Sequence, residues 1–418
     1  MLTLRWVSRD GRLLLTTRAL RTFGYGYLAV ALGLYLQQLG FDAVHVGLVL
    51  TAAVAGSAAM NVLWSLVADR FGRRRTVATM AALMVGGGLV FALTDRFWLL
   101  VLGAFTGTIS ASSSEVGPFM TVEQAILPQT TSDERRTWLF SIYDTIGTLA
   151  GAAGALLTGT VGLFARLGLA GASAYRPLFL LYAAIGLANL VLFTRLSDRV
   201  ESPRVEGGRR FLGLHRSTGT VAKLSALFGL DALAGGFVVQ SIVAYWFHLR
   251  WGLSPATLGV LFFWVGVLSG LSLLAAGWSA RRFGLLNTMV FTHLPSNVLL
   301  ILVPLAPSAW LAMLLFLARM SVSQMDVPTR KSYTMAVVAP DERMAAAGIT
   351  NVARTVASAA APALSGIAVA AGALGLPFLV AGGLKVVYDA LVYATFRGVR
   401  PREEHVTRAA ANRWPPAP

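Results

Sequence analysis

A short polar turn after the second long apolar run reads SLVADRFGRRR at residues 65–75. A related turn reads GWSARRFG at residues 277–284, and the two copies share Ala, Arg, Phe and Gly at an offset of 212 residues. The same offset aligns Gly24 with Gly236 in the apolar sequence before each turn. The chain of 418 residues is therefore predicted to consist of two halves of similar construction.

The composition excludes a water-soluble enzyme. Hydrophobic residues make up 56% of the chain and charged residues 13%, whereas about a quarter of the residues in a soluble domain are charged. A transmembrane helix needs about 20 mostly apolar residues. Twelve runs meet this requirement: 20–39, 46–67, 76–94, 97–128, 137–163, 177–195, 221–249, 256–279, 287–306, 308–337, 345–371 and 377–396.

Positive charge marks alternate ends of the predicted helices. The chain carries 35 Lys and Arg against 19 Asp and Glu, which gives a formal net charge of +16. Arginines are concentrated in residues 5–21, 73–75, 195–216 and 397–413, whereas the opposite connections hold few. The positive-inside rule then places both termini and the central connection in the cytoplasm. Because topology accounts for the arginines, no nucleic-acid partner is expected.

The predicted fold is an all-α membrane protein with twelve transmembrane helices in two six-helix bundles. The N-terminal bundle covers residues 1–195, and the C-terminal bundle covers residues 221–400. An Arg-rich cytoplasmic linker, residues 196–220, joins them, and residues 401–418 form a cytoplasmic tail. Parallel repeats of this kind occur in transporters whose binding site lies near the bilayer midplane.

The turn at residues 65–75 resembles the cytoplasmic signature loop of the major facilitator superfamily. Ser65 stands where the family usually has Gly, and Arg281 occupies the Asp position of the degenerate second copy. The resemblance implies a secondary transporter that works by alternating access, with a conformation-sensitive gate at this turn. The alternative is a turn that only determines topology. The gate residues would be Asp69, Gly72, Arg73 and Arg74.

The fourth-span signature of the superfamily's proton-driven exporters is absent, and their fifth-span pattern is only echoed. Their fourth span carries an Arg four residues before a Gly, and Gly103 occupies the Arg place when Gly107 is aligned. The fifth span contains Gly147, Gly151 and Gly154 but no Pro, a spacing that indicates close helix packing. Export is favoured as the direction of transport, without a signature that requires it.

Ionisable side chains at membrane depth are costly and indicate function. Glu115 lies 18 residues from both Phe97 and the turn at Asp133, which bound the fourth segment. Pro118 predicts a break in that helix because it lacks a backbone donor. Glu123 lies nearer the cytoplasm, and Asp144 lies eight residues past Arg136. The candidates for proton coupling are Glu115, Asp144 and Glu123.

The C-terminal half has the opposite charge emphasis. Arg319 and Asp326 flank the middle of the tenth segment, Pro328 breaks it, and Arg354 lies eleven residues past Arg343. The other midspan charges are Asp231, an Asp326–Arg330 pair and a Lys385–Asp389 pair, each pair four residues apart as helix neighbours require. His248 and His293 are expected to be packed or interfacial residues.

Three interpretations of these charges stay open. In the first, Arg319 and Arg354 hold an anionic group of the substrate while Glu115 or Asp144 carries the coupling proton. In the second, opposed charges pair across a cavity as a latch, and polar side chains hold the substrate. In the third, each charge is neutralised locally and marks no site. The candidate substrate-binding residues are Arg319, Arg354, Tyr25, Tyr143, Gln240, Asn351 and Asp326.

The predicted function is secondary active transport of a small organic solute across the cell inner membrane, with proton coupling. A monomer is expected, with neither cofactor nor metal, and with no use of ATP. The chain is not expected to be an enzyme, because it has no Cys and no convincing nucleotide-binding or nucleophile motif. The alternatives are an uncoupled facilitator and an exporter of amphiphiles or lipids. From another class, the alternative is a non-transporting receptor-like or scaffold protein.

Overall fold

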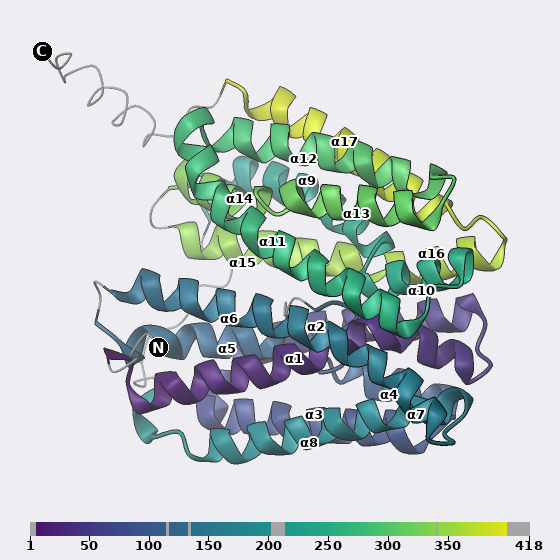
Figure 1. Cartoon of the computed structure of the whole chain (residues 1–418). Coiled ribbons are helices and arrows are strands. Elements are labelled where there is room, and N and C mark those ends of the chain that lie inside the picture. The colour runs from purple at the N-terminus through teal and green to yellow at the C-terminus, as the bar shows by residue number, and fades with distance from the viewer. Residues whose placement is uncertain (1–5, 114–116, 133–134, 202–213, 340–341, 399–418) are drawn as a thin grey trace, which may run out of the picture. The chain divides into compact units, whose positions relative to one another are not determined.

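The computed structural model describes residues 6–113, 117–132, 135–201, 214–339 and 342–398. These residues form helices joined by short turns, without a strand (Figure 1). The first helices are α1 (Arg9–Gln38), α2 (Ala43–Phe71), α3 (Arg73–Leu93), α4 (Phe97–Phe105), α5 (Pro118–Ile126), α6 (Arg136–Leu156), α7 (Thr160–Arg166) and α8 (Arg176–Thr194). The later helices are α9 (Thr218–Phe237), α10 (Gln240–Trp251), α11 (Pro255–Phe283), α12 (Leu285–Leu302), α13 (Ala309–Ser323), α14 (Asp326–Val337), α15 (Arg343–Ala359), α16 (Ala361–Ala370) and α17 (Leu376–Phe396). Short 3-10 turns lie at Leu127–Thr130, Leu157–Gly159, Gly171–Ala174, Asp198–Val200 and Val303–Leu305.

Ten segments of the described chain are long and apolar enough to cross a membrane. The expected spans 20–39 and 97–128 are not among these ten. The first lies within α1, whose 30 residues also contain Tyr, Gln and five charged side chains. The second is divided, because α4 ends at Phe105 and α5 begins with Pro118 in its first turn. The total of twelve spans, with both termini in the cytoplasm, stays a prediction.

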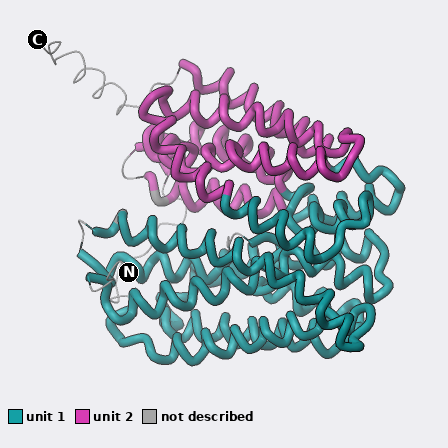
Figure 2. The backbone as a smooth tube through the Cα atoms, in the orientation of Figure 1, with its two compact units in different colours: residues 1–207, 236–267, 359–377 teal, residues 208–235, 268–358, 378–418 magenta. Residues whose placement is uncertain are grey.

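The chain divides into two compact units (Figure 2). Unit 1 contains residues 1–207, 236–267 and 359–377, and unit 2 contains residues 208–235, 268–358 and 378–418. The division into bundles at residues 195 and 221 is a prediction from the repeat, as are the linker and the tail. Residues 202–213 of that linker and the whole of the tail, 401–418, lie outside the described residues.

Unit 1 is built on helix pairs that approach closely at glycines. Helices α1 and α6 lie side by side, as do α3 and α8 (Figure 1). A Cβ atom at Gly26 would collide with the carbonyl oxygen of Gly151, and one at Gly154 with that of Phe23. The predicted packing role of Gly151 and Gly154 is therefore met in the α1–α6 contact, because a side chain there would push the helices apart.

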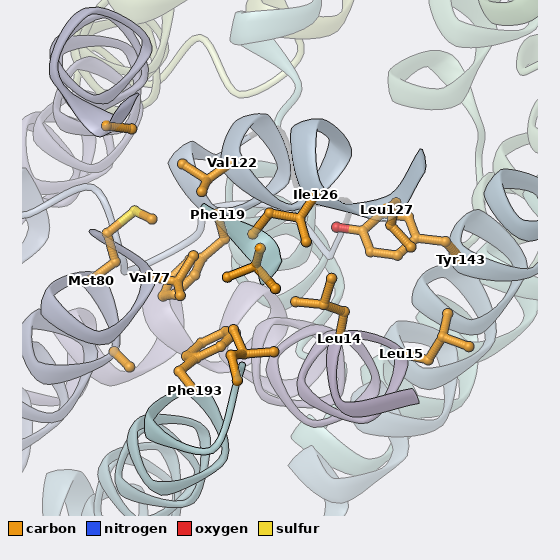
Figure 3. Packing of buried hydrophobic residues seen from close by; sticks show 14 of the residues in the cluster. Leu14, Leu15, Val77, Met80, Phe119, Val122, Ile126, Leu127, Tyr143 and Phe193 are labelled. Atoms are coloured by element: carbon orange, nitrogen blue, oxygen red, sulfur yellow. The ribbon is translucent and has the colours of Figure 1, made fainter. Parts of the chain in front are cut away.

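Unit 1 contains a cluster of buried hydrophobic side chains, shown from close by in Figure 3. Leu14 and Leu15 of α1 meet Phe119 and Ile126 of α5, together with Phe193 of α8. All five side chains are at most 4% exposed. The cluster holds α5 against the bundle and so determines where Glu123, on the same short helix, is placed.

Two segments from the second half of the sequence complete unit 1. Ser241 of α10 donates its hydroxyl to the carbonyl oxygen of Ala29 at 2.8 Å. The backbone N–H of Ala363, in α16, donates to the Thr51 hydroxyl at 2.9 Å. Contact with α1 and α2 therefore explains why residues 236–267 and 359–377 group with the N-terminal helices.

Unit 2 has its own hydrophobic cluster, formed by α9, α12, α14 and α17. Its buried members are Leu224, Phe228, Met289, Val290, Tyr333, Tyr388, Val392 and Phe396. The same helices carry most of the charged side chains in unit 2 that are described below.

Candidate functional site: a buried charge network

The centre of unit 2 contains a carboxylate shared by three cations. Asp231 of α9 is 4% exposed. Its Oδ2 accepts hydrogen bonds from Arg330 Nη1 at 2.9 Å and from Arg354 Nη1 at 3.1 Å. Its Oδ1 accepts one from Lys385 Nζ at 2.5 Å. Helices α14, α15 and α17 are thus joined to α9 through a single side chain, since a buried charge requires partners.

A second carboxylate extends the network along α14. Asp326 Oδ2 accepts from Arg330 Nη1 at 3.0 Å, which confirms the predicted pair four residues apart. The break between α13 and α14 falls at residues 324–325, and Pro328 lies in the first turn of α14, where a missing N–H costs little. The break therefore precedes the proline by three residues.

The predicted Lys385–Asp389 pair is wrong. Lys385 bonds to Asp231, and Asp389 Oδ1 lies 2.8 Å from His293 Nδ1 instead. Asn297 Nδ2 donates to Asp389 Oδ2 at 2.9 Å. Asp231 and Asp389 are both nearly fully buried, so each must find partners on neighbouring helices, and these requirements override the i,i+4 spacing.

Arg319 differs from the other three cations of this network in its surroundings. Within the described residues it has no carboxylate oxygen within 4.0 Å. Its Nη1 contacts the Met320 sulfur at 3.1 Å, and its Nε is buried without a hydrogen-bond partner. Asp231 and Asp326 lie near enough to act on it electrostatically. The described network of unit 2 therefore holds four cations, Arg319, Arg330, Arg354 and Lys385, against three carboxylates, Asp231, Asp326 and Asp389.

Unit 1 contains a separate buried ion pair around Glu123. Arg21 binds this carboxylate through two nitrogens, at 2.9 Å and 2.7 Å, and both side chains are 0% exposed. The Tyr143 hydroxyl donates to Glu123 Oε2 at 2.6 Å, and the Thr17 hydroxyl lies 3.3 Å from Oε1. The role of Arg21 is not predictable from the sequence, since Arg21 lies at the edge of an apolar run among the topological arginines and nothing in its neighbourhood distinguishes it.

The other predicted residues occupy varied positions. Glu115 lies outside the described residues. Asp144 is on an exposed face of α6, and Asn351 is on an exposed face of α15. Tyr25 is 3% exposed, with its ring 6.2 Å from that of Tyr182. Gln240 Oε1 accepts from the backbone N–H of Ser113 at 3.1 Å. Within unit 1, then, Tyr143 joins Glu123, whereas Gln240 binds the backbone between α4 and α5.

The signature turn has a compact set of contacts in unit 1. Asp69 Oδ1 accepts from Arg73 Nε at 3.0 Å, and Gly72 adopts a φ of 99°, a conformation that favours glycine. Glu201 accepts the backbone N–H groups of Arg73 at 2.6 Å and of Arg74 at 3.2 Å. This carboxylate caps the positive end of α3. The role of Glu201 is not predictable from local sequence, because 128 residues separate it from Arg73.

A carboxylate in unit 2 holds the start of α9 in the same way. Glu342 accepts hydrogen bonds from the backbone N–H groups of Ser217 at 2.8 Å and Arg216 at 2.7 Å, and from that of His215. A hydrogen bond from the Ser217 side chain has the largest effect on the pKa of Glu342. Together with the backbone hydrogen bonds it lowers that pKa to about 2. Because the pKa in the folded state lies below the ordinary value, this contact stabilises the fold above about pH 4 and is lost as the pH falls through about 2.

Comparison with known proteins decides the family. The sequence model of the Major Facilitator Superfamily matches residues 14–250. The chain belongs to this superfamily. An uncharacterized membrane protein of Saccharomyces cerevisiae is 28% identical over 425 residues, covering 94% of this chain and 95% of its own.

Solved structures of the superfamily share the fold. A bacterial homolog of the human lysosomal transporter Spinster matches with a TM-score of 0.74 at 15% identity, over 97% of this chain and 98% of that one. The nucleoside transporter NupG matches with a TM-score of 0.72 at 15% identity, over 93% and 99% of the two chains. A D-xylose–proton symporter matches with a TM-score of 0.71 at 17% identity, over 92% and 97%. This superfamily member is therefore a multi-pass membrane transporter and not an enzyme.

Proposed function

We propose that this superfamily member transports a small organic anion by alternating access, coupled to protons, in the cell inner membrane. The observation that carries the proposal is Arg319, whose guanidinium has no carboxylate within 4.0 Å among the described residues although its Nε is buried. Arg319 is half-buried at membrane depth, where a charge without a counterion is costly, and an anionic substrate would supply one.

Arg354 is the second proposed anchor. Its side chain is 28% exposed, whereas those of Arg330 and Lys385 are 9% and 8% exposed. An incoming anion therefore reaches Arg354 more readily than the other two cations on Asp231. With four cations against three carboxylates, the network has a net positive charge, which favours the binding of an anion.

The remaining parts of the proposal come from the sequence. Glu115, Glu123 and Asp144 are the carboxylates proposed for proton coupling, and the turn at Asp69 and Gly72 is the proposed gate. We expect a monomer. Export is the direction that the sequence favours, and transport measured in both orientations of the protein in liposomes determines it.

The experiment is a thermal-stability screen of the purified full chain against monocarboxylates, dicarboxylates and phosphate esters, because a bound ligand stabilises the folded state. An anion that stabilises the protein is then tested on R319Q and R354Q. We expect each variant to lose about tenfold or more in affinity, since a hydrogen bond to a charged group contributes about 1.5–3 kcal/mol.

The matched control is K331Q, which removes a cation from an exposed position of α14. It should keep the affinity of the unmodified protein. Equal affinity in R319Q, R354Q and K331Q would show that these arginines do not bind the anion. Stabilisation by neutral solutes alone would contradict the anionic substrate altogether.

A further inference from the structure

His293 lies between two buried carboxylates of unit 2. Its Nδ1 is 2.8 Å from Asp389 Oδ1, and its Nε2 is 3.8 Å from Asp231 Oδ1. The side chain is 4% exposed, and the ring of Tyr388 meets it edge-on at 5.8 Å. The charged and titratable groups around it are Asp231 on α9, Asp326 and Arg330 on α14, Arg354 on α15, and Lys385, Tyr388 and Asp389 on α17.

Each ring nitrogen of His293 faces a carboxylate oxygen, and Nδ1 also lies 3.1 Å from the Asn297 amide nitrogen, which donates to Asp389 Oδ2. A neutral ring can donate a proton to only one of the two carboxylates. A neutral imidazole has one N–H and one lone pair, whereas an imidazolium donates from both nitrogens. If Nδ1 donates to Asp389, the neutral ring presents a lone pair to the Asp231 carboxylate. Protonation of Nε2 would replace that repulsion with attraction.

The positive charge around Asp231 depends in part on Arg354. Three cations already bind this carboxylate, and Arg354 is the most exposed of them. An anion that binds Arg354 competes with Asp231 for the same guanidinium. Asp231 then has less compensating charge, and the imidazolium of His293 becomes more favourable beside it.

We propose that His293, rather than any of the three carboxylates that the sequence offers for proton coupling, binds the coupled proton. Asp231 then links the two ligands by exchanging Arg354 for the His293 imidazolium. This proposal rests on the proposed transport of an anion. One monoanion and one proton enter together, so the net charge of the network is the same before and after binding. His293 takes this role in place of the packing role that its sequence context indicates.

The coupling has a definite direction. If the anion favours the proton, the proton favours the anion by the same factor, since linkage of binding free energies is reciprocal. Two ligands that favour each other's binding move in the same direction. An inward proton gradient would then drive uptake of the anion, opposite to the export that the sequence favours.

The experiment measures the protonation of His293 in the full-length protein without a substrate. The chain contains five histidines, and nitrogen NMR of ¹⁵N-histidine-labelled protein in lipid nanodiscs distinguishes imidazole from imidazolium. The H293Q variant identifies the signal. R354Q removes the competing cation and should raise the imidazolium-to-imidazole ratio of His293 at pH 7 about tenfold, and D231N should lower it by a similar factor.

Three controls keep the result interpretable. R354K retains the charge and should restore the original ratio, and K331Q should leave it unchanged. His248, whose Nδ1 lies 2.9 Å from the Leu253 carbonyl oxygen in unit 1, should not respond to any of these variants. A His293 ratio that is the same in D231N and R354Q would overturn the proposal. Failure of every anion to bind would contradict the proposed substrate but would leave this readout intact.

Discussion

At the scale of single residues, each of the buried carboxylates Asp231 and Glu123 accepts more than one hydrogen bond from cationic side chains. Asp231 binds three cations from three helices, and Glu123 binds Arg21 through both of its oxygens. Several hydrogen bonds to each carboxylate compensate for the loss of water, which one surface-type ion pair does not do. Arg319 lacks this compensation within the described residues, and that difference separates a candidate binding residue from structural charges.

The Glu123–Arg21 pair should be strongly stabilising only while both partners are present. We expect E123A to lower the free energy of unfolding by about 3–5 kcal/mol, because Arg21 is then left as an uncompensated buried charge. The measurement is denaturant unfolding in detergent micelles, followed by tryptophan fluorescence.

The matched control is D95A, which breaks the exposed Arg176–Asp95 pair and should cost under about 1 kcal/mol. The double variant R21M/E123M should be less destabilised than E123A, because it removes both charges. Equal losses in E123A and D95A would mean that burial of the pair contributes nothing to stability.

At the scale of helices, proline and glycine have separate roles. Pro118 begins α5 and Pro328 lies in the first turn of α14, so each follows a break in a long apolar segment. Gly154 and Gly26 lie instead where α1 and α6 are in backbone contact. The breaks were predictable because a proline lacks a donor in any surroundings. The glycine contacts were predictable in kind from their spacing, but the partner helix was not.

The G154A variant tests the α1–α6 contact. The added methyl group would meet the Phe23 carbonyl oxygen, and we expect a loss of about 1–3 kcal/mol of stability from overpacking. Thermal unfolding of the purified protein measures it. G86A in α3 serves as the control, because no atom lies within 4 Å of the position its Cβ would take. A G154A protein as stable as G86A would argue against the close approach.

At the scale of the whole molecule, the membrane determines where charge can lie. The excess of positive charge is concentrated in alternate connections, and both termini are predicted to be cytoplasmic. The same rule places residues 167–174, between α7 and α8, on the outer side.

Single cysteines test this topology directly, because the chain contains no Cys. We expect A170C to react with a membrane-impermeant maleimide in intact cells, since the loop is exposed and predicted to be external. A409C, in the tail, should react only after the membrane is permeabilised. Labelling of A409C in intact cells would reverse the predicted orientation.

The class of protein follows from features that are local in the sequence. Length, apolar runs, alternating arginines and the repeated turn at residues 65–75 indicated a major facilitator transporter, because bilayer thickness and insertion act on local composition. Depth in the membrane also follows from position along a helix, so Asp231, Asp326 and Arg354 could be identified as midspan charges, and Glu123 as a charge nearer the cytoplasm.

Only the tertiary structure decided which charges meet. Lys385 binds Asp231 and not Asp389, Arg21 binds Glu123 from 102 residues away, and Glu201 caps α3 across 128 residues. Pairing in a low-dielectric interior depends on distances between helices that are far apart in sequence, and no local pattern contains those distances. For the same reason, the sequence around His293 indicates an ordinary packed residue, whereas in the fold Asp389 and Asp231 lie on either side of its ring.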